Sequence, residues 1–148
     1  MIGNLLRDIT GHLHRQATNY TVSLQLIEVR PVQSENSSAL VRRMTGVQAV
    51  LGGIETVDAN RVCAEVLEAL QYAGFKGAGP GIEVARDPAF QAMMNQLQVD
   101  LRRLASASIK VDSFWLQGGH PAYPVFWDFA FLFHGSDKIT LFIGSASD

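Results

Sequence analysis

The side chains best suited to binding chemistry lie close together in one stretch of the C-terminal third of this 148-residue chain. Residues 117–124 carry His120 and Tyr123 between glycines and prolines, and Trp115 and Trp127 flank the stretch. Connections held on a rigid sheet often carry binding residues, and tyrosine and tryptophan are favoured anchors at protein interfaces. We therefore expect a binding site here. The alternative is a stiff connection whose aromatic side chains complete the core.

Asp128 is the most unusual single residue, because it interrupts a strand pattern that is apolar on both faces. Such a carboxylate is either held by a loop or an arginine, or it serves a pocket. His134 shares its strand face, but six positions at about 3.3 Å each put the two side chains about 20 Å apart. Each side chain therefore needs its own partner, and we add Asp128 to the expected binding residues.

Two further histidines, His12 and His14, form a His-x-His pair that would point both imidazoles the same way on a strand. The apolar spacing around them is helical, however, and two positions on a helix are rotated by about 200°. This pair cannot chelate one ion by itself, so we interpret both as ordinary surface histidines and expect no metal site.

Other chemical motifs are weak. The Gly-Ala-Gly-Pro-Gly run at residues 77–81 lacks the lysine and hydroxyl residue of a phosphate-binding loop, and we interpret it as a turn. Cys63 falls on the apolar face of a predicted helix, which favours a buried structural thiol over a nucleophile. No Gly-x-Ser-x-Gly motif occurs. We expect no catalytic residue and no cofactor.

Composition bounds the class of protein. The chain is 47% hydrophobic and 18% charged, with 12 basic and 14 acidic residues and a net charge of −2. Its single cysteine excludes an intramolecular disulfide. Nucleic-acid binding is disfavoured unless the fold joins Arg42, Arg43, Arg102 and Arg103 into one face. No segment reaches the roughly 20 apolar residues of a membrane span, so we expect a soluble, cytoplasmic protein without membrane contact.

The elements that position these side chains begin with a predicted helix, and a predicted strand follows it. Apolar spacing predicts a helix over residues 2–17 and a strand over residues 20–29. Residues 39–51 fit either a helix or a hairpin turning at Thr45-Gly46; we favour the helix and expect Gly52-Gly53 to end it. Two further helices start at the capping residues Asp58 and Asp87, and Gly74 is placed to close the first of them.

The C-terminal part predicts strands over residues 109–116, 125–134 and 138–143, with a possible short strand at 82–84. The whole pattern predicts one α+β domain, residues 1–148, with helices packed on a mainly antiparallel sheet that ends in a three-stranded meander. Residues 125–134 are apolar on both faces and predict a central strand. We expect the N-terminal helix to cover one face and the two later helices the other; alternatively, one face closes against another chain.

These features favour a non-enzymatic interaction protein, such as an inhibitor, a scaffold or an assembly subunit. It would bind another protein, or itself, through apolar sheet surface and the His/Tyr/Pro connection. The alternative is a small-molecule-binding domain or enzyme with a pocket around Asp128, His120 and Tyr123. A cavity with Asp128 in its wall would favour the alternative, and an apolar patch bordered by Trp115 and Tyr123 would favour the interaction protein.

Overall fold

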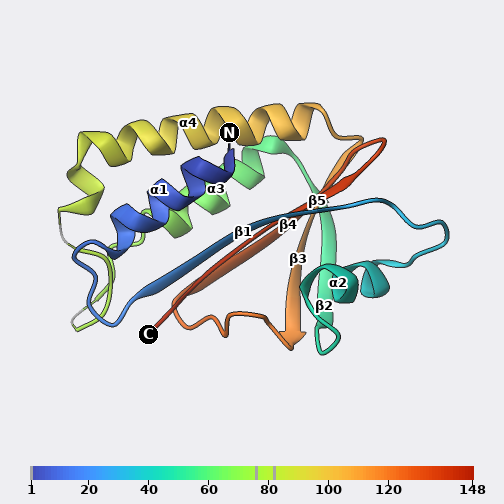
Figure 1. The fold of residues 1–148 in the computed structure, drawn as a ribbon, viewed down its shortest axis with the longest axis horizontal. Coiled ribbons are helices and arrows are strands. Elements are labelled where there is room, and N and C mark those ends of the chain that lie inside the picture. The colour runs from blue at the N-terminus through green and yellow to red at the C-terminus, as the bar shows by residue number, and fades with distance from the viewer. Residues whose placement is uncertain (1, 76, 82) are drawn as a thin grey trace.

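The computed structural model describes residues 2–75, 77–81 and 83–148, and its elements confirm the predicted α+β class (Figure 1). The helices are α1 (Ile2–His14), α2 (Ser37–Thr45), α3 (Ala59–Leu70), the short 3-10 helix η1 (Val84–Arg86) and α4 (Pro88–Ser106). The strands are β1 (Thr21–Val29), β2 (Val50–Val57), β3 (Lys110–Gly118), β4 (Trp127–His134) and β5 (Ile139–Ser147).

All five strands form one antiparallel sheet in the order β1-β5-β4-β3-β2 (Figure 1). Strands β3, β4 and β5 are neighbours in both sequence and space, which confirms the predicted meander. The first strand pairs with the last along its whole length, from Thr21 opposite Ser147 to Val29 opposite Ile139. Strands β4 and β5 are therefore central, and β1 and β2 are the two edges.

Three helices, α1, α3 and α4, lie on one face of the sheet (Figure 1). Their apolar stripes pack on alternate strand residues, among them Val111, Phe129, Phe131 and Phe142. The prediction that the N-terminal helix lies opposite the two later helices is wrong, because all three share this core. Helical periodicity identifies the buried side of each helix but does not specify which face of the sheet that side meets.

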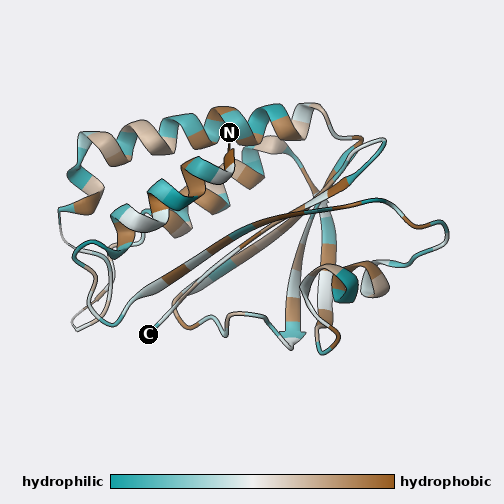
Figure 2. Cartoon of the chain, viewed as in Figure 1, coloured by the Kyte–Doolittle hydropathy of each residue, from teal (hydrophilic) through white to brown (hydrophobic). Residues whose placement is uncertain are grey.

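The opposite face is covered by the short helix α2. Leu40, Val41 and Met44 of this helix share a second core with apolar residues of β3, β4 and β5. Phe131 and Leu132 point to opposite faces of β4, and both side chains are fully buried. The central strand is therefore covered on both faces within one chain, as the sequence led us to expect. In Figure 2, hydrophilic and hydrophobic bands alternate along α4, as packing on one side requires.

The ambiguous segment at residues 39–51 contains the favoured helix and the beginning of a strand. Helix α2 ends at Thr45, and Gly46 donates its backbone N–H to the carbonyl of Arg42. The expectation that Gly52-Gly53 ends an element is wrong, since both lie inside β2 at a shift in its pairing with β3. The shift lets the strand continue through residues that usually weaken one.

The predicted helix starts are confirmed by their hydrogen bonds. The Asp58 carboxylate accepts the backbone N–H of Arg61 at 2.8 Å, and the Asp87 carboxylate accepts that of Ala89 at 2.9 Å. Gly74 has a positive φ of +82°, as predicted, but α3 already ends at Leu70.

The possible short strand at residues 82–84 is not formed at residues 83–84. Ile82 lies outside the described residues, and Val84 is the first residue of η1.

Strands β3 and β4 are paired over only part of their length and then separate. They pair only from Lys110 opposite His134 to Ser113 opposite Phe131. Beyond this point β3 continues paired with β2, and β4 continues paired with β5. Trp115 and Trp127 therefore lie on two diverging arms of the sheet.

Candidate functional site

Trp115 lies flat against the glycines of the neighbouring edge strand. A Cβ atom added to Gly53 would lie 2.0 Å from Cζ2 of the Trp115 ring, and one added to Gly52 would lie 2.6 Å from its Cδ1. Although the ring is seated on this backbone, 52% of the residue remains exposed. The glycines thus make room for an aromatic platform that faces solvent on one side.

Other exposed apolar side chains lie at the same end of the β2–β3 pair. Val50 is half exposed and pairs with Gly118, and Val47 is 88% exposed just before β2 begins. The backbone at Gly119 passes close to the Gln48 carbonyl, since an added Cβ would lie 2.0 Å from that oxygen. We call Val47, Val50 and Trp115 the Trp115 surface.

Tyr123 extends outward from the connection between β3 and β4. It is 81% exposed and has a positive φ of +47°, so the backbone turns there and presents the ring to solvent. Val125 follows it, half exposed, and donates its backbone N–H to the Ala146 carbonyl. Tyr123 is therefore exposed and available for contact.

His120 turns inward from the same connection. Its Nδ1 accepts the backbone N–H of Ala122 at 3.0 Å, which leaves the ring proton on Nε2 in the neutral form. That Nε2 atom is buried and has no hydrogen-bond partner among the described residues. Burial lowers the pKa of His120 below its ordinary value, and the nearby charge of Asp128 opposes this shift. The His120 side chain thus bonds back to the backbone of its own connection at Ala122.

His134 finds its partner on the neighbouring strand. Its Nε2 lies 2.9 Å from Oδ2 of Asp112, a residue that is only 4% exposed. The other Asp112 oxygen accepts the Thr56 hydroxyl at 2.9 Å, and the Lys110 ammonium lies 3.5 Å from Oδ2. This group joins β2, β3 and β4 around one buried carboxylate. Local sequence patterns do not reveal this group, because Asp112 and His134 become neighbours only through the register of β3 and β4.

Trp127 belongs to an aromatic cluster at the beginning of β4. Its indole N–H donates to the Tyr20 hydroxyl at 2.7 Å. Burial raises the pKa of Tyr20 to about 12. The Phe126 ring lies 5.6 Å from that of Tyr20 and 5.8 Å from that of Tyr72, measured between centroids. The ring of Trp127 is thus fixed at its edge by a partner 107 positions away in the chain.

Asp128 is exposed beside this cluster and lines a cavity of about 310 Å³ between α3 and β4. The side chains of Tyr72, Phe126 and Trp127 also contribute to the lining. His120 and Tyr123 do not line it, although the charge of Asp128 acts on His120, so the five predicted site residues do not share one pocket. The structure divides them into the exposed Trp115, the β3–β4 connection, and the Trp127–Asp128 cavity.

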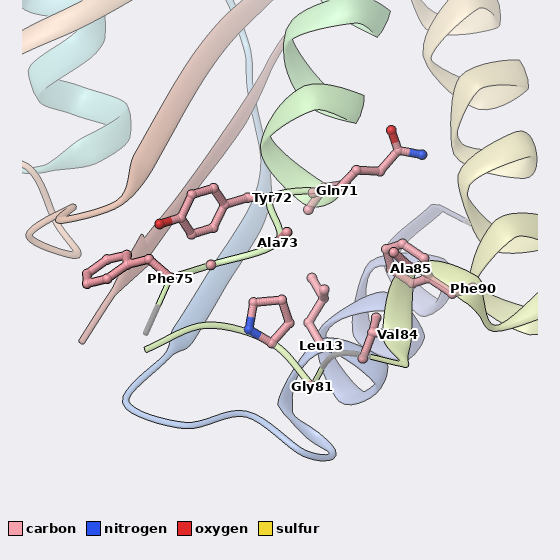
Figure 3. Close-up of a pocket in the computed structure, with 12 residues that line it drawn as sticks. Leu13, Gln71, Tyr72, Ala73, Phe75, Gly81, Val84, Ala85 and Phe90 are labelled. Atoms are coloured by element: carbon pink, nitrogen blue, oxygen red, sulfur yellow. The ribbon is translucent and has the colours of Figure 1, made fainter. Parts of the chain in front are cut away.

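A second cavity of about 220 Å³ lies where α1, α3 and η1 meet (Figure 3). Apolar side chains dominate its walls, including Leu13, Leu70, Val84 and Phe90. No acidic, basic or histidine side chain lines it among the described residues. It has the character of a small apolar void and lacks groups that orient a polar ligand.

A larger groove, about 760 Å³, runs between α1, α4 and the β1 side of the sheet. Its lining mixes the carboxylates of Asp8, Glu28 and Asp100 with the cations of Arg103 and Lys138, and Lys138 is paired with Glu28. Neither sign of charge dominates, so the groove does not indicate one class of ligand.

The remaining candidates have structural contacts. His12 lies 3.1 Å from the Asp87 carboxylate and links α1 to the start of α4, so it is no ordinary surface histidine. His14 accepts the backbone N–H of Val22 at 2.8 Å. Cys63 is buried, and burial raises the pKa of its thiol. No cluster of three or more metal-ligating side chains occurs in the described ranges.

The four arginines do not form one basic face. Arg42 and Arg43 belong to α2, and Arg102 and Arg103 belong to α4, which covers the opposite face of the sheet (Figure 1). One bidentate contact, made of two hydrogen bonds from Nε and Nη2 of Arg43, also holds this guanidinium to the Glu35 carboxylate. The condition for a nucleic-acid surface is therefore not met by these residues.

No described helix combines the length and the apolar character needed to cross a membrane. Comparisons of the chain with protein-family models, with curated proteins and with solved structures find no match.

Proposed function

We propose that this chain is a non-enzymatic protein-interaction module that binds another protein, or a second copy of itself, through the Trp115 surface. The observation that carries the proposal is the half-exposed Trp115 ring seated on Gly52 and Gly53. A tryptophan fixed in place loses little conformational freedom on binding and offers a large apolar area, which is why tryptophans dominate many interfaces.

The surroundings of Trp115 support this proposal. Strand β2 is an edge of the sheet, and edge strands present backbone groups that a second chain can pair with. Val47 and Val50 add exposed apolar area at the same end of that strand. Tyr123 extends from the connection that follows β3 and adds a second aromatic anchor.

The surface that we propose differs from the one that the sequence suggested. The sequence suggested an apolar sheet face, but helices cover both faces of the central strands. His120, expected as part of the contact, points inward. The proposed surface is therefore the end of the β2–β3 pair, with Tyr123 beside it in the connection. The buried thiol of Cys63 is compatible with a cytoplasmic location, which we include in the proposal.

A second candidate function, small-molecule binding, is favoured by the cavity that Asp128 lines. The cavity has aromatic walls and acidic groups, which are the elements of a ligand site. Its lining differs from that of the pocket expected from sequence. Besides Asp128 it includes Glu65 and Glu68 of α3, and it does not include His120 or Tyr123.

The interaction proposal can be tested by site-specific photocrosslinking in the native host. A photoreactive phenylalanine analogue is placed at position 115, at position 47 and, as control, at Val99, an exposed apolar residue on α4. We expect the same discrete protein adduct at positions 115 and 47 and none at 99. Equal adducts at all three positions, or none at 115 and 47, would contradict the proposal.

A further inference from the structure

We infer that the cavity between α3 and the beginning of β4 binds an organic cation, an alkylammonium group in particular. This site goes beyond the proposed protein contact and shares no residue with the Trp115 surface. Its volume is about 310 Å³. The lining residues are Glu65, Glu68, Ala69, Tyr72, Phe126, Trp127 and Asp128.

The aromatic part of the lining is fixed before any ligand arrives. The rings of Tyr72 and Phe126 stack at 5.8 Å with an angle of 27° between their planes. Trp127 is stacked on Phe129 at 5.8 Å and is held at its edge by the hydrogen bond to Tyr20. Aromatic faces attract a cation within about 6 Å of the ring centre, and tryptophan attracts it most strongly. The rings that line the cavity are therefore held in place by their neighbours before any cation binds.

The charged part of the lining is entirely acidic. Glu65 and Glu68 come from α3 on one side, and Asp128 comes from β4 on the other. Glu65 is already paired with Arg61, whereas Glu68 and Asp128 form no ion pair with any described residue. No lysine, arginine or histidine contributes to the described lining. Charge complementarity thus selects a cation and disfavours carboxylates and phosphates.

The divergence of the sheet accounts for the site's position. Strand β3 leaves β4 after Ser113 and Phe131, so Trp127 and Asp128 pair with β5 alone. Their other side is thereby open, and α3 residues bound the space that remains. The cavity is large enough for a trimethylammonium group or for the ammonium end of a lysine side chain. A free amine metabolite and a lysine on another protein are the two sources of this chemistry.

Isothermal titration calorimetry of the whole chain with three probes tests the inference. Choline represents a free ammonium compound, acetyl-lysine methylamide represents a protein side chain, and 3,3-dimethylbutanol is the uncharged analogue of choline. We expect at least one cation to bind and the uncharged analogue not to bind. The cation that binds more tightly identifies the source.

Two conservative variants locate the binding. Asp128→Asn and Glu68→Gln each remove one charge at a solvent-exposed position, so the fold is retained. Each should weaken cation binding about fivefold, the effect of one charge at about 4 Å in water. Glu83→Gln is the matched control, because Glu83 is exposed, lies outside the cavity and makes no capping hydrogen bond.

Three results would overturn the inference. One is that neither cation binds to the wild-type chain. Another is that the uncharged analogue binds as tightly as choline, because the cavity would then be merely apolar. The third is that Glu83→Gln weakens binding as much as Asp128→Asn, because the effect would then be that of net charge alone.

Discussion

At the scale of single residues, Gly53 decides where the Trp115 ring can lie. A methyl group at this position would lie 2.0 Å from ring atoms, so Gly53→Ala must displace the ring or the strand. We expect the free energy of unfolding to fall by about 1 to 3 kcal/mol, the usual cost of overpacking. Urea denaturation followed by tryptophan fluorescence measures both the stability and the change at the ring.

The control for this substitution is Gly11→Ala in the interior of α1. Nothing lies within 4 Å of a Cβ built at Gly11, so the added methyl group meets open space. Because alanine favours the helix over glycine, this variant should gain about 1 kcal/mol. A similar loss in both variants would show that the Trp115 contact is not the cause.

His120 makes stability depend on pH in a defined direction. Burial lowers its pKa in the folded chain below the ordinary value of 6.5, so the unfolded chain binds the proton more readily. The free energy of unfolding should therefore decrease as the pH falls below about 6.5, and His120 should have no such effect above it. Denaturation of the wild type and of His120→Asn between pH 4 and pH 8 measures this. An identical pH dependence in both proteins would contradict the assignment.

At the scale of elements, the buried Asp112 carboxylate ties together the strands on both sides of β3. Asp112→Ala leaves the Thr56 hydroxyl and the His134 ring without their shared acceptor. We expect a loss of about 1 to 3 kcal/mol, the cost of an unsatisfied buried polar group. Chemical denaturation checks it. The exposed Asp137→Asn substitution, in the turn before β5, serves as a control and should change little.

The elements themselves were largely predictable, because their signals are local. The side-chain caps at Asp58 and Asp87 and the apolar stripes behind them need no knowledge of distant residues. The prediction for Gly52-Gly53 was wrong because their role depends on a residue that is distant in the chain. The two glycines make room for the Trp115 ring of β3. The sequence of β2 gives no sign of this contact, because Trp115 lies more than sixty positions away in the chain.

At the scale of the whole molecule, two cores share the central strands. Phe131 and Leu132 are adjacent in sequence but belong to different cores. Phe131→Ala and Leu132→Ala should each cost several kcal/mol, about 3 to 5 for the phenylalanine and 2 to 5 for the leucine. Both variants should still unfold in one transition, with circular dichroism and fluorescence coinciding. A second transition in Leu132→Ala would show that the α2 side unfolds separately.

The sequence identified individual candidate residues, but it did not predict how they are grouped in space. Trp115 and Tyr123 are exposed, as a contact would require, and their role in binding stays a prediction. Their grouping with His120, Trp127 and Asp128 did not hold, because the separation of β3 from β4 places the two tryptophans on different arms. The contribution of Glu65 and Glu68 to the Asp128 cavity depends on how α3 is placed over the sheet, which no local pattern encodes.

Trp115 is the proposed anchor of a protein contact. The most direct measurement is the solution mass, by light scattering, of the chain with the partner that crosslinks at position 115, or alone if that partner is a second copy. Wild type and Val99→Ser should give the mass of the complex. Trp115→Ser should give separate chains, since losing a tryptophan anchor costs at least about 2 kcal/mol of binding. A complex of unchanged mass and affinity with Trp115→Ser would contradict the claim.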